Sequence, residues 1–162
     1  MNILAIDPGT EESAILNYKD GKISDAAMWP NILLLELLGD HDMQPRTGPA
    51  DPELCIENVA SYGMAVGREV FETVFWIGRF YQQWKIATGR DPRLIYRRDI
   101  KLHLCGSARA KDKNIRQALL DKVGPQGTKK APGPTYGIGK HLWSALAIAV
   151  YAAETTSTTG IA

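Results

Sequence analysis

The sequence predicts an α/β fold in which a mixed sheet of five strands, a three-stranded antiparallel meander plus two parallel strands, is flanked by helices. Three strand-like segments follow one another at the start of the chain, with tight turns between them. Two further strand-like segments alternate with helical ones, the order that produces parallel pairs. With 162 residues, 44% of them hydrophobic, we expect one domain over residues 1–155 and a flexible C-terminal tail over residues 156–162.

The first strand is expected at Ile3–Ile6, a continuous apolar run typical of strands buried on both faces. It ends on Asp7, and the turn-forming residues Pro8-Gly9-Thr10 follow. Asp is disfavoured in strands and costly to bury alone, so a carboxylate at this place needs a partner. A divalent metal ion is one candidate, and capping of the following turn is the other.

Two strands at Ser13–Tyr18 and Ile23–Trp29 complete the meander, because Asp20-Gly21 between them favours a hairpin turn. A short apolar helix is expected at Ile32–Leu38. After a polar loop over residues 40–52, a fourth strand is expected at Glu53–Val59.

A long amphipathic helix is expected from about Val66 to Thr88, ended by Gly89. A fifth strand at Arg93–Tyr96 and a short helix around Asp99–Leu104 follow. The apolar residues that define the expected core face of the long helix are Val66, Val70, Val74, Ile77, Tyr81 and Trp84.

The last third of the chain predicts two more helices, at Lys111–Val123 and from Lys140 to about Glu154. Between them, residues 124–139 are rich in Gly and Pro, and we expect an exposed, mobile loop. Neither a signal peptide nor a membrane-spanning segment is recognisable, so a cytoplasmic location is expected. Cys55 and Cys105 have no metal-site spacing and are interpreted as reduced, packed thiols without a catalytic role.

Charge is distributed very unevenly along the chain. The formal net charge is +1, but residues 1–76 carry −9 and residues 77–162 carry +10. A basic half of this kind can neutralise nucleic-acid phosphates, and pairing between the two halves or with solvent is the alternative.

Two acids inside apolar strands are the candidate centre of the chemistry. Asp7 ends the first strand and Glu57 lies within the fourth, so their side chains can converge if these strands are neighbours. Paired carboxylates suit the hard cations Mg²⁺ and Mn²⁺, which prefer oxygen ligands. Taken alone, Glu57 is also compatible with a structural pair to an Arg side chain.

Three motifs resemble the RuvC-type Holliday junction resolvases of the ribonuclease H-like superfamily. The segment ILAIDPGT resembles the first motif of that family, CIEN the second and KHLWSALAIA the third. The segments IENVASYGMAVGREVFETVFWIGRF, KDKNIRQALLDKVG and GTKKAPGPTYGI resemble a phage-associated branch. The resemblance implies a ribonuclease H-like fold and a homodimer, with the long helix at the dimer interface. The implied activity is symmetric cutting of a four-way DNA junction.

The resemblance also implies a metal site. Two Mg²⁺ or Mn²⁺ ions would activate a water molecule and stabilise the leaving 3′ oxygen during attack on a phosphodiester. Asp7 would bridge both ions and Glu57 would bind one of them. His141 fits the first ligand position of the third motif, as a metal ligand or general base.

The third motif departs from the family at Ser144, where an Asp is usual. Ser144 is three residues after His141 on the expected helix, so it should face the same site with a hydroxyl group. Three interpretations follow. This branch of the family works with fewer acids, Asp112 supplies the missing carboxylate, or the chain is a weakened or deliberately altered enzyme. We favour the first. Asp112 is flanked by cations, so a place in the first turn of a helix is at least as good an interpretation.

Candidate DNA-binding side chains are mostly the cations of the basic half. They would position phosphates without reading sequence. Tyr62 and Met64 are candidates for stacking or wedging at an opened junction, and packing is the alternative for Tyr62. The cationic candidates are Arg97, Arg98, Lys101, Arg109, Lys111, Lys113, Arg116, Lys129, Lys130 and Lys140.

The sequence thus predicts a Mg²⁺- or Mn²⁺-dependent endonuclease that resolves four-way junctions in a bacterial or phage-infected cell. One alternative is a nuclease of the same fold with broader activity on branched DNA or RNA–DNA hybrids. The other is a junction-binding protein without cleavage activity, which Ser144 keeps open. Branched DNA and a second copy of the chain are the expected partners, and no membrane is expected.

Overall fold

A single mixed sheet with strand order β3-β2-β1-β4-β5 is the centre of the computed structural model, which describes residues 1–40 and 52–156. The antiparallel pairs are β1 with β2 and β2 with β3, and the parallel pairs are β1 with β4 and β4 with β5. The predicted meander plus two parallel strands is therefore confirmed. The strands are β1 (Asn2–Asp7), β2 (Glu12–Lys19), β3 (Lys22–Pro30), β4 (Glu53–Asn58) and β5 (Arg93–Tyr96).

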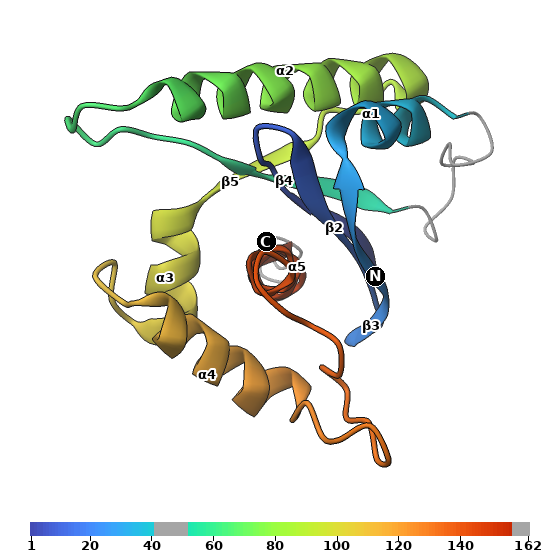
Figure 1. The fold of residues 1–162 in the computed structure, drawn as a ribbon, viewed down its shortest axis with the longest axis vertical. Helices are drawn as coiled ribbons and strands as arrows, with labels where there is room; N and C mark the ends of the chain where they lie inside the picture. The colour runs from blue at the N-terminus through green and yellow to red at the C-terminus, as the bar shows by residue number, and fades with distance from the viewer. Residues whose placement is uncertain (41–51, 157–162) are drawn as a thin grey trace, which may run out of the picture.

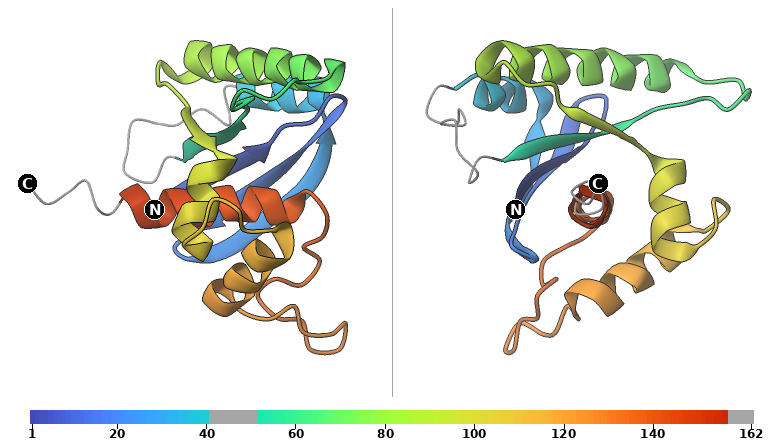
Figure 2. Two further views of the ribbon diagram at one scale, coloured as in Figure 1. Left: turned by 90° about the vertical axis from the view of Figure 1, so that its left-hand side faces the viewer. Right: turned by 180° about the vertical axis from the view of Figure 1, so that it is seen from behind.

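Helices cover both faces of the sheet (Figure 1). The α1–α2 pair packs on one face, while α5 packs on the other with α3 and α4 outside it (Figure 2). The sheet is thus buried between two layers. The helices are α1 (Asn31–Gly39), α2 (Arg68–Thr88), α3 (Arg97–Cys105), α4 (Asp112–Val123) and α5 (Leu142–Thr156).

The residues of β1 alternate between the two hydrophobic cores. Ile3 and Ala5 face the core that contains α5, and Leu4 and Ile6 face the core beneath α1 and α2. Both faces of the strand are buried, which explains its unbroken apolar run. Asp7 is the last residue of this strand, which is the central one of the sheet.

The core face predicted for α2 is only partly correct. The fully buried residues are Ile77, Phe80 and Trp84, in the part of the helix that packs with Leu34, Leu38, Leu54 and Ile56. Val74 is 45% exposed, and Val66 precedes the helix. The apolar pattern continues beyond the segment that the rest of the chain covers, which leaves an exposed apolar surface.

The helix boundaries differ from the prediction at both ends of α5. Its first residue is Leu142 because Lys140 has φ of 39°, which a right-handed helix does not allow. Its last residue is Thr156, which was expected in the tail. The remainder of the expected tail, and residues 41–51 of the expected polar loop, lie outside the described residues.

The Gly- and Pro-rich segment before α5 is exposed as predicted, and it folds back on itself. Thr128 N donates to Ala131 O over 3.0 Å, and Gly133 N donates to Gln126 O over 2.9 Å. Lys129 is exposed within this turn. Backbone hydrogen bonds therefore shape the segment that the sequence suggested was a mobile loop.

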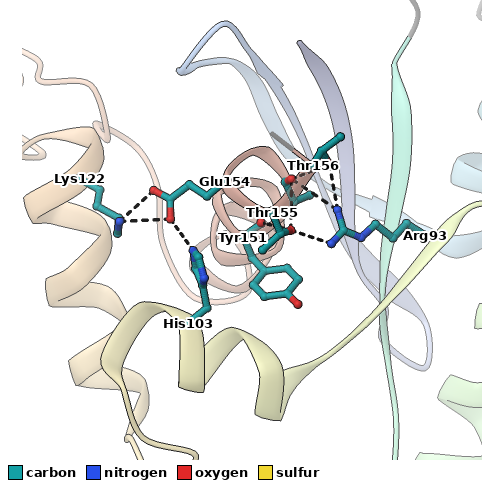
Figure 3. A network of polar contacts seen from close by, with 8 residues as sticks. Arg93, His103, Lys122, Tyr151, Glu154, Thr155 and Thr156 are labelled. Atoms are coloured by element: carbon teal, nitrogen blue, oxygen red, sulfur yellow. Dashed lines mark hydrogen bonds and ion pairs between the residues drawn. The ribbon is translucent and has the colours of Figure 1, made fainter. Parts of the chain in front are cut away.

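Polar contacts tie the outer helices to the far end of α5 (Figure 3). Lys122 of α4 donates to both carboxylate oxygens of Glu154, at 2.9 and 3.2 Å, and His103 of α3 contacts the same carboxylate. Arg93 of β5 donates to Thr155 over 2.6 Å. These contacts fix α3 and α4 relative to α5, which also sets where the N-termini of α3 and α4 lie.

Both thiols are unpaired, with Cys55 buried and Cys105 half-buried. Cys55 is thus packed as predicted, and Cys105 only partly so. In the described part of the chain, no helix combines the length and apolar character needed to cross a bilayer.

Candidate active site

Two neighbouring strands carry the candidate acids at the same edge of the sheet. In the parallel pair of β1 and β4, Ile6 lies beside Ile56, so Asp7 and Glu57 follow at adjacent strand positions. Their side chains are 14% and 18% exposed. The structure therefore brings together the two carboxylates on which the metal prediction depends.

The shared burial of these acids makes their ionised forms unfavourable. Burial raises the pKa of Asp7, an effect that His141, Arg97 and Ser144 only partly offset. Burial, with the nearby charge of Asp7 as the next cause, raises the pKa of Glu57 to about 7. Two carboxylates held in this way stabilise any cation that comes between them.

The turn that begins α5 places two more predicted residues beside Asp7. His141 Nδ1 lies 3.2 Å from Asp7 Oδ2, in hydrogen-bonding contact, and the His141 side chain is 68% exposed. Ser144, in the first turn of α5, is near enough to Asp7 to oppose the rise of its pKa. His141 lies just before the helix, and its carbonyl accepts from Ala145 N over 3.1 Å, so both side chains still face one site.

Arg97, a DNA-binding candidate whose contact with DNA stays a prediction, lies between the carboxylates of Glu57 and Asp112. Its Nη1 donates to Glu57 Oε2 over 3.3 Å, and its Nη2 donates to Asp112 Oδ1 over 2.8 Å. The side chain is only 26% exposed. The sequence carried one signal for this place, since Arg97 directly follows the expected fifth strand, which the structure pairs with the strand of Glu57.

Asp112 reaches the site only through Arg97. It is the first residue of α4, its side chain is 82% exposed, and Arg97 lowers its pKa. The first-turn position is the interpretation that the sequence allowed besides metal binding. The structure confirms that position and adds the ion pair.

The three expected metal ligands do not form one group: Asp7 pairs with His141, and Glu57 pairs with Arg97. Within residues 1–40 and 52–156, no three His, Cys, Asp or Glu side chains form a group that could hold a metal ion. The donor chemistry nevertheless fits a divalent cation, because the two adjacent carboxylates supply oxygen ligands and burial, the main cause of their raised pKa values, favours a bound positive charge.

A buried polar network supports the turn after Asp7. Gly9 N donates to Ser13 Oγ over 3.1 Å, Ser13 Oγ donates to Asn31 Oδ1 over 2.6 Å, and Asn31 Nδ2 donates to Gly9 O over 3.0 Å. A Cβ atom at Gly9 would lie 2.2 Å from Glu12 O. Sequence reasoning missed Ser13 and Asn31, whose importance depends on the pairing of distant segments.

Two hollows of opposite charge flank the site. One, of about 310 Å³, is lined by Asp7, Glu11, Glu12 and His141 among others. The other, of about 370 Å³, includes Ser144. Its charged lining residues are Arg97, Asp112, Lys113, Arg116 and Lys140. The site thus has an acidic side suited to cations and a predominantly basic side suited to phosphates.

The remaining DNA-binding candidates occupy different parts of the surface. Arg98 lies over the ring of Tyr62, 5.9 Å from its centroid, and Tyr62 is 57% exposed. Met64 is 72% exposed in the same loop. The other cations lie on α3, in the α3–α4 connection or in the turn before α5, and their contact with DNA stays a prediction: Lys101, Arg109, Lys111, Lys129 and Lys130.

Comparison with known proteins identifies the fold. No family model and no curated protein matches the chain. A solved structure of RuvC from Thermus thermophilus has a TM-score of 0.66 and 16% identity, covering 98% of this chain and 97% of that one. RuvC of the same organism in complex with a Holliday junction substrate has a TM-score of 0.66 and 18% identity, with 98% and 96% coverage. The chain therefore has the ribonuclease H-like fold of RuvC, a five-stranded mixed sheet flanked by helices.

Proposed function

We propose that this protein is a divalent-metal-dependent endonuclease that resolves four-way DNA junctions by phosphodiester hydrolysis. The observation that carries the proposal is the buried pair of Asp7 and Glu57 at one sheet edge, with His141 and Ser144 beside it. The similar fold of a RuvC that binds a Holliday junction substrate supports DNA of this kind as the substrate. We infer an intracellular role in DNA recombination or repair.

Asp7, Glu57 and His141 would hold Mg²⁺ or Mn²⁺, and the resemblance to RuvC-type resolvases implies two ions. Bound ions would activate water and stabilise the leaving 3′ oxygen. Ser144, which is near Asp7, would help to orient the Asp7 carboxylate through its hydroxyl group. In its alternative role as general base, the exposed His141 ring would accept a proton from an attacking water molecule.

The basic hollow beside Ser144 would hold the DNA backbone. Lys113, Arg116 and Lys140 line it together with Trp143, over whose ring Arg116 lies at 5.0 Å. Neutralising phosphates on this side would place the backbone next to the acids. Tyr62, supported by Arg98, offers an exposed ring for an unstacked base at the junction centre.

A junction-binding function without cleavage is the second candidate, because Glu57 pairs with Arg97, apart from Asp7 and His141, and Ser144 stands where the related motif has an acid. One assay separates the possibilities. A synthetic four-way junction, a linear duplex of the same sequence and an RNA–DNA hybrid are incubated with Mg²⁺, Mn²⁺ or EDTA. We expect metal-dependent, paired nicks in the junction only. Binding without nicks would favour the second candidate, and equal cutting of all three substrates would contradict junction resolution.

We also propose a homodimer formed through α2, because this helix exposes large apolar side chains that the described chain does not cover. Phe71 and Phe75 are 64% and 66% exposed, one helical turn apart. Symmetric cutting of a four-way junction requires two active sites, which a twofold dimer supplies.

Changing Phe71 and Phe75 together to Glu should convert the dimer to a monomer, because each carboxylate would be buried in an apolar contact. Light scattering after gel filtration measures the mass. Leu102→Glu on α3 is the control, since Leu102 is also exposed, at 44%, but lies on another layer. A wild-type protein that is monomeric at high concentration, or a double variant that stays dimeric, would contradict this interface.

A further inference from the structure

Arg97, with its partner Asp112, lies beside the candidate acids but has no role in the proposed chemistry. It lies at the start of α3, directly after β5, and Ile95 of β5 pairs with Glu57 of β4. This register delivers the guanidinium to the Glu57 carboxylate. A cation of the chain itself therefore occupies the surroundings of a candidate metal ligand.

The two acids that hold Arg97 differ in their environment. Glu57 is buried beside Asp7 and accepts over 3.3 Å, whereas Asp112 is largely exposed and accepts over the shorter distance of 2.8 Å. The guanidinium presents different nitrogens to the two carboxylates, so it bridges them. Asp112 thereby anchors Arg97 from the solvent side.

A guanidinium group and a divalent cation compete for the carboxylate of Glu57. Both use carboxylate oxygens as ligands, and positive charges a few ångströms apart repel each other, most strongly where water is excluded. With Glu57 in contact with Arg97, only the other two expected ligands, Asp7 and His141, pair with each other. Charge at position 97 should therefore act directly on cation affinity.

We propose that Arg97 is a positioning residue that shares Glu57 with the incoming divalent cation and weakens its binding, while Asp112 anchors the guanidinium. The inference rests on the proposed function, because it takes Asp7 and Glu57 as the cation ligands. The inference adds Arg97 as a residue that sets the affinity of the site for a divalent cation. An ordinary structural tie between β4, α3 and α4 would predict no such effect.

Mn²⁺ titration of the complete chain, with free Mn²⁺ measured by electron paramagnetic resonance, tests the proposal without DNA. Arg97→Gln should bind Mn²⁺ about tenfold more tightly than wild type, because a positive charge beside the site is lost. Arg97→Lys keeps the charge and should stay close to wild type. Equal or weaker binding by a folded Arg97→Gln variant would overturn the proposal.

A double-mutant cycle tests the role of Asp112. Asp112→Asn should weaken Mn²⁺ binding in the wild-type background, since the guanidinium then turns fully to Glu57. It should have little effect in the Arg97→Gln background, because Asp112 is exposed and its own field is screened. Equal effects in both backgrounds would show that Asp112 does not act through Arg97.

Two further measurements keep the outcomes distinct. Asp7→Asn should abolish specific Mn²⁺ binding in every background, and its failure to do so would contradict the proposed function itself. If Arg97→Gln does not fold, Mg²⁺ titration of the wild-type protein followed by the side-chain ¹⁵N resonances of Arg97 replaces it. A shift of those resonances with saturation supports the shared carboxylate, and unchanged resonances on Mg²⁺ binding at Asp7 overturn it.

Discussion

Asp7→Asn should reduce junction cutting by about a thousandfold or more while leaving junction binding nearly intact. Loss of a residue central to catalysis commonly has an effect of this size or larger. The amide is nearly isosteric, keeps the place at the end of β1 and removes the charge on which cation binding depends. Gel assays of cutting and binding on the same four-way junction measure the two effects separately.

The same substitution should stabilise the metal-free protein near neutral pH. Asp7 is one cause of the raised pKa of Glu57, so its removal relieves repulsion between two buried carboxylates. Relief of about 1 kcal/mol corresponds to a melting temperature higher by roughly 2–4 °C in a chain of this length. The control is Asp25→Asn at an exposed position of β3, which should change neither cutting nor melting. A folded Asp7→Asn variant that cuts at the wild-type rate would remove Asp7 from the mechanism.

The metal-free protein should lose stability as the pH rises from about 4.5 to about 7. The pKa of Glu57 is about 7 in the folded chain against 4.5 normally, so the folded state holds a proton in this window that the unfolded state releases. Unfolding then releases a proton, and the free energy of unfolding falls with rising pH. At about 1.4 kcal/mol per pH unit, the difference between 4.5 and about 7 gives about 3 kcal/mol.

Urea unfolding at a series of pH values measures this slope. Glu57→Gln should flatten the curve in this window and should raise stability near neutral pH, because no buried charge has to form. Glu36→Gln, at an exposed position of α1, is the control and should keep the wild-type slope. Saturating Mg²⁺ should also reduce the slope, since it stabilises the ionised carboxylates. Parallel curves for wild type and Glu57→Gln would assign the pH dependence to other groups.

Local signals were sufficient for the order of the elements. The apolar run before Asp7 and the Asp20-Gly21 turn predicted a buried strand and a hairpin, and both are present. Both signals depend on residues that are close together in the sequence, so they can be recognised without knowing the tertiary contacts. The face of α2 was predicted less well, because which apolar residues become buried depends on what packs against the helix.

The candidate site also combines features that local sequence predicts with features that depend on tertiary packing. The sequence by itself determined that Asp7 and Glu57 end or interrupt buried strands, since a carboxylate in such a segment is recognisable without any partner. Only the tertiary structure decided that β1 and β4 are neighbours, that Arg97 lies between Glu57 and Asp112, and that Ser13 and Asn31 support the turn at Gly9. Ion pairs and buried hydrogen bonds join residues far apart in the chain, and their formation requires the complete packing of sheet and helices.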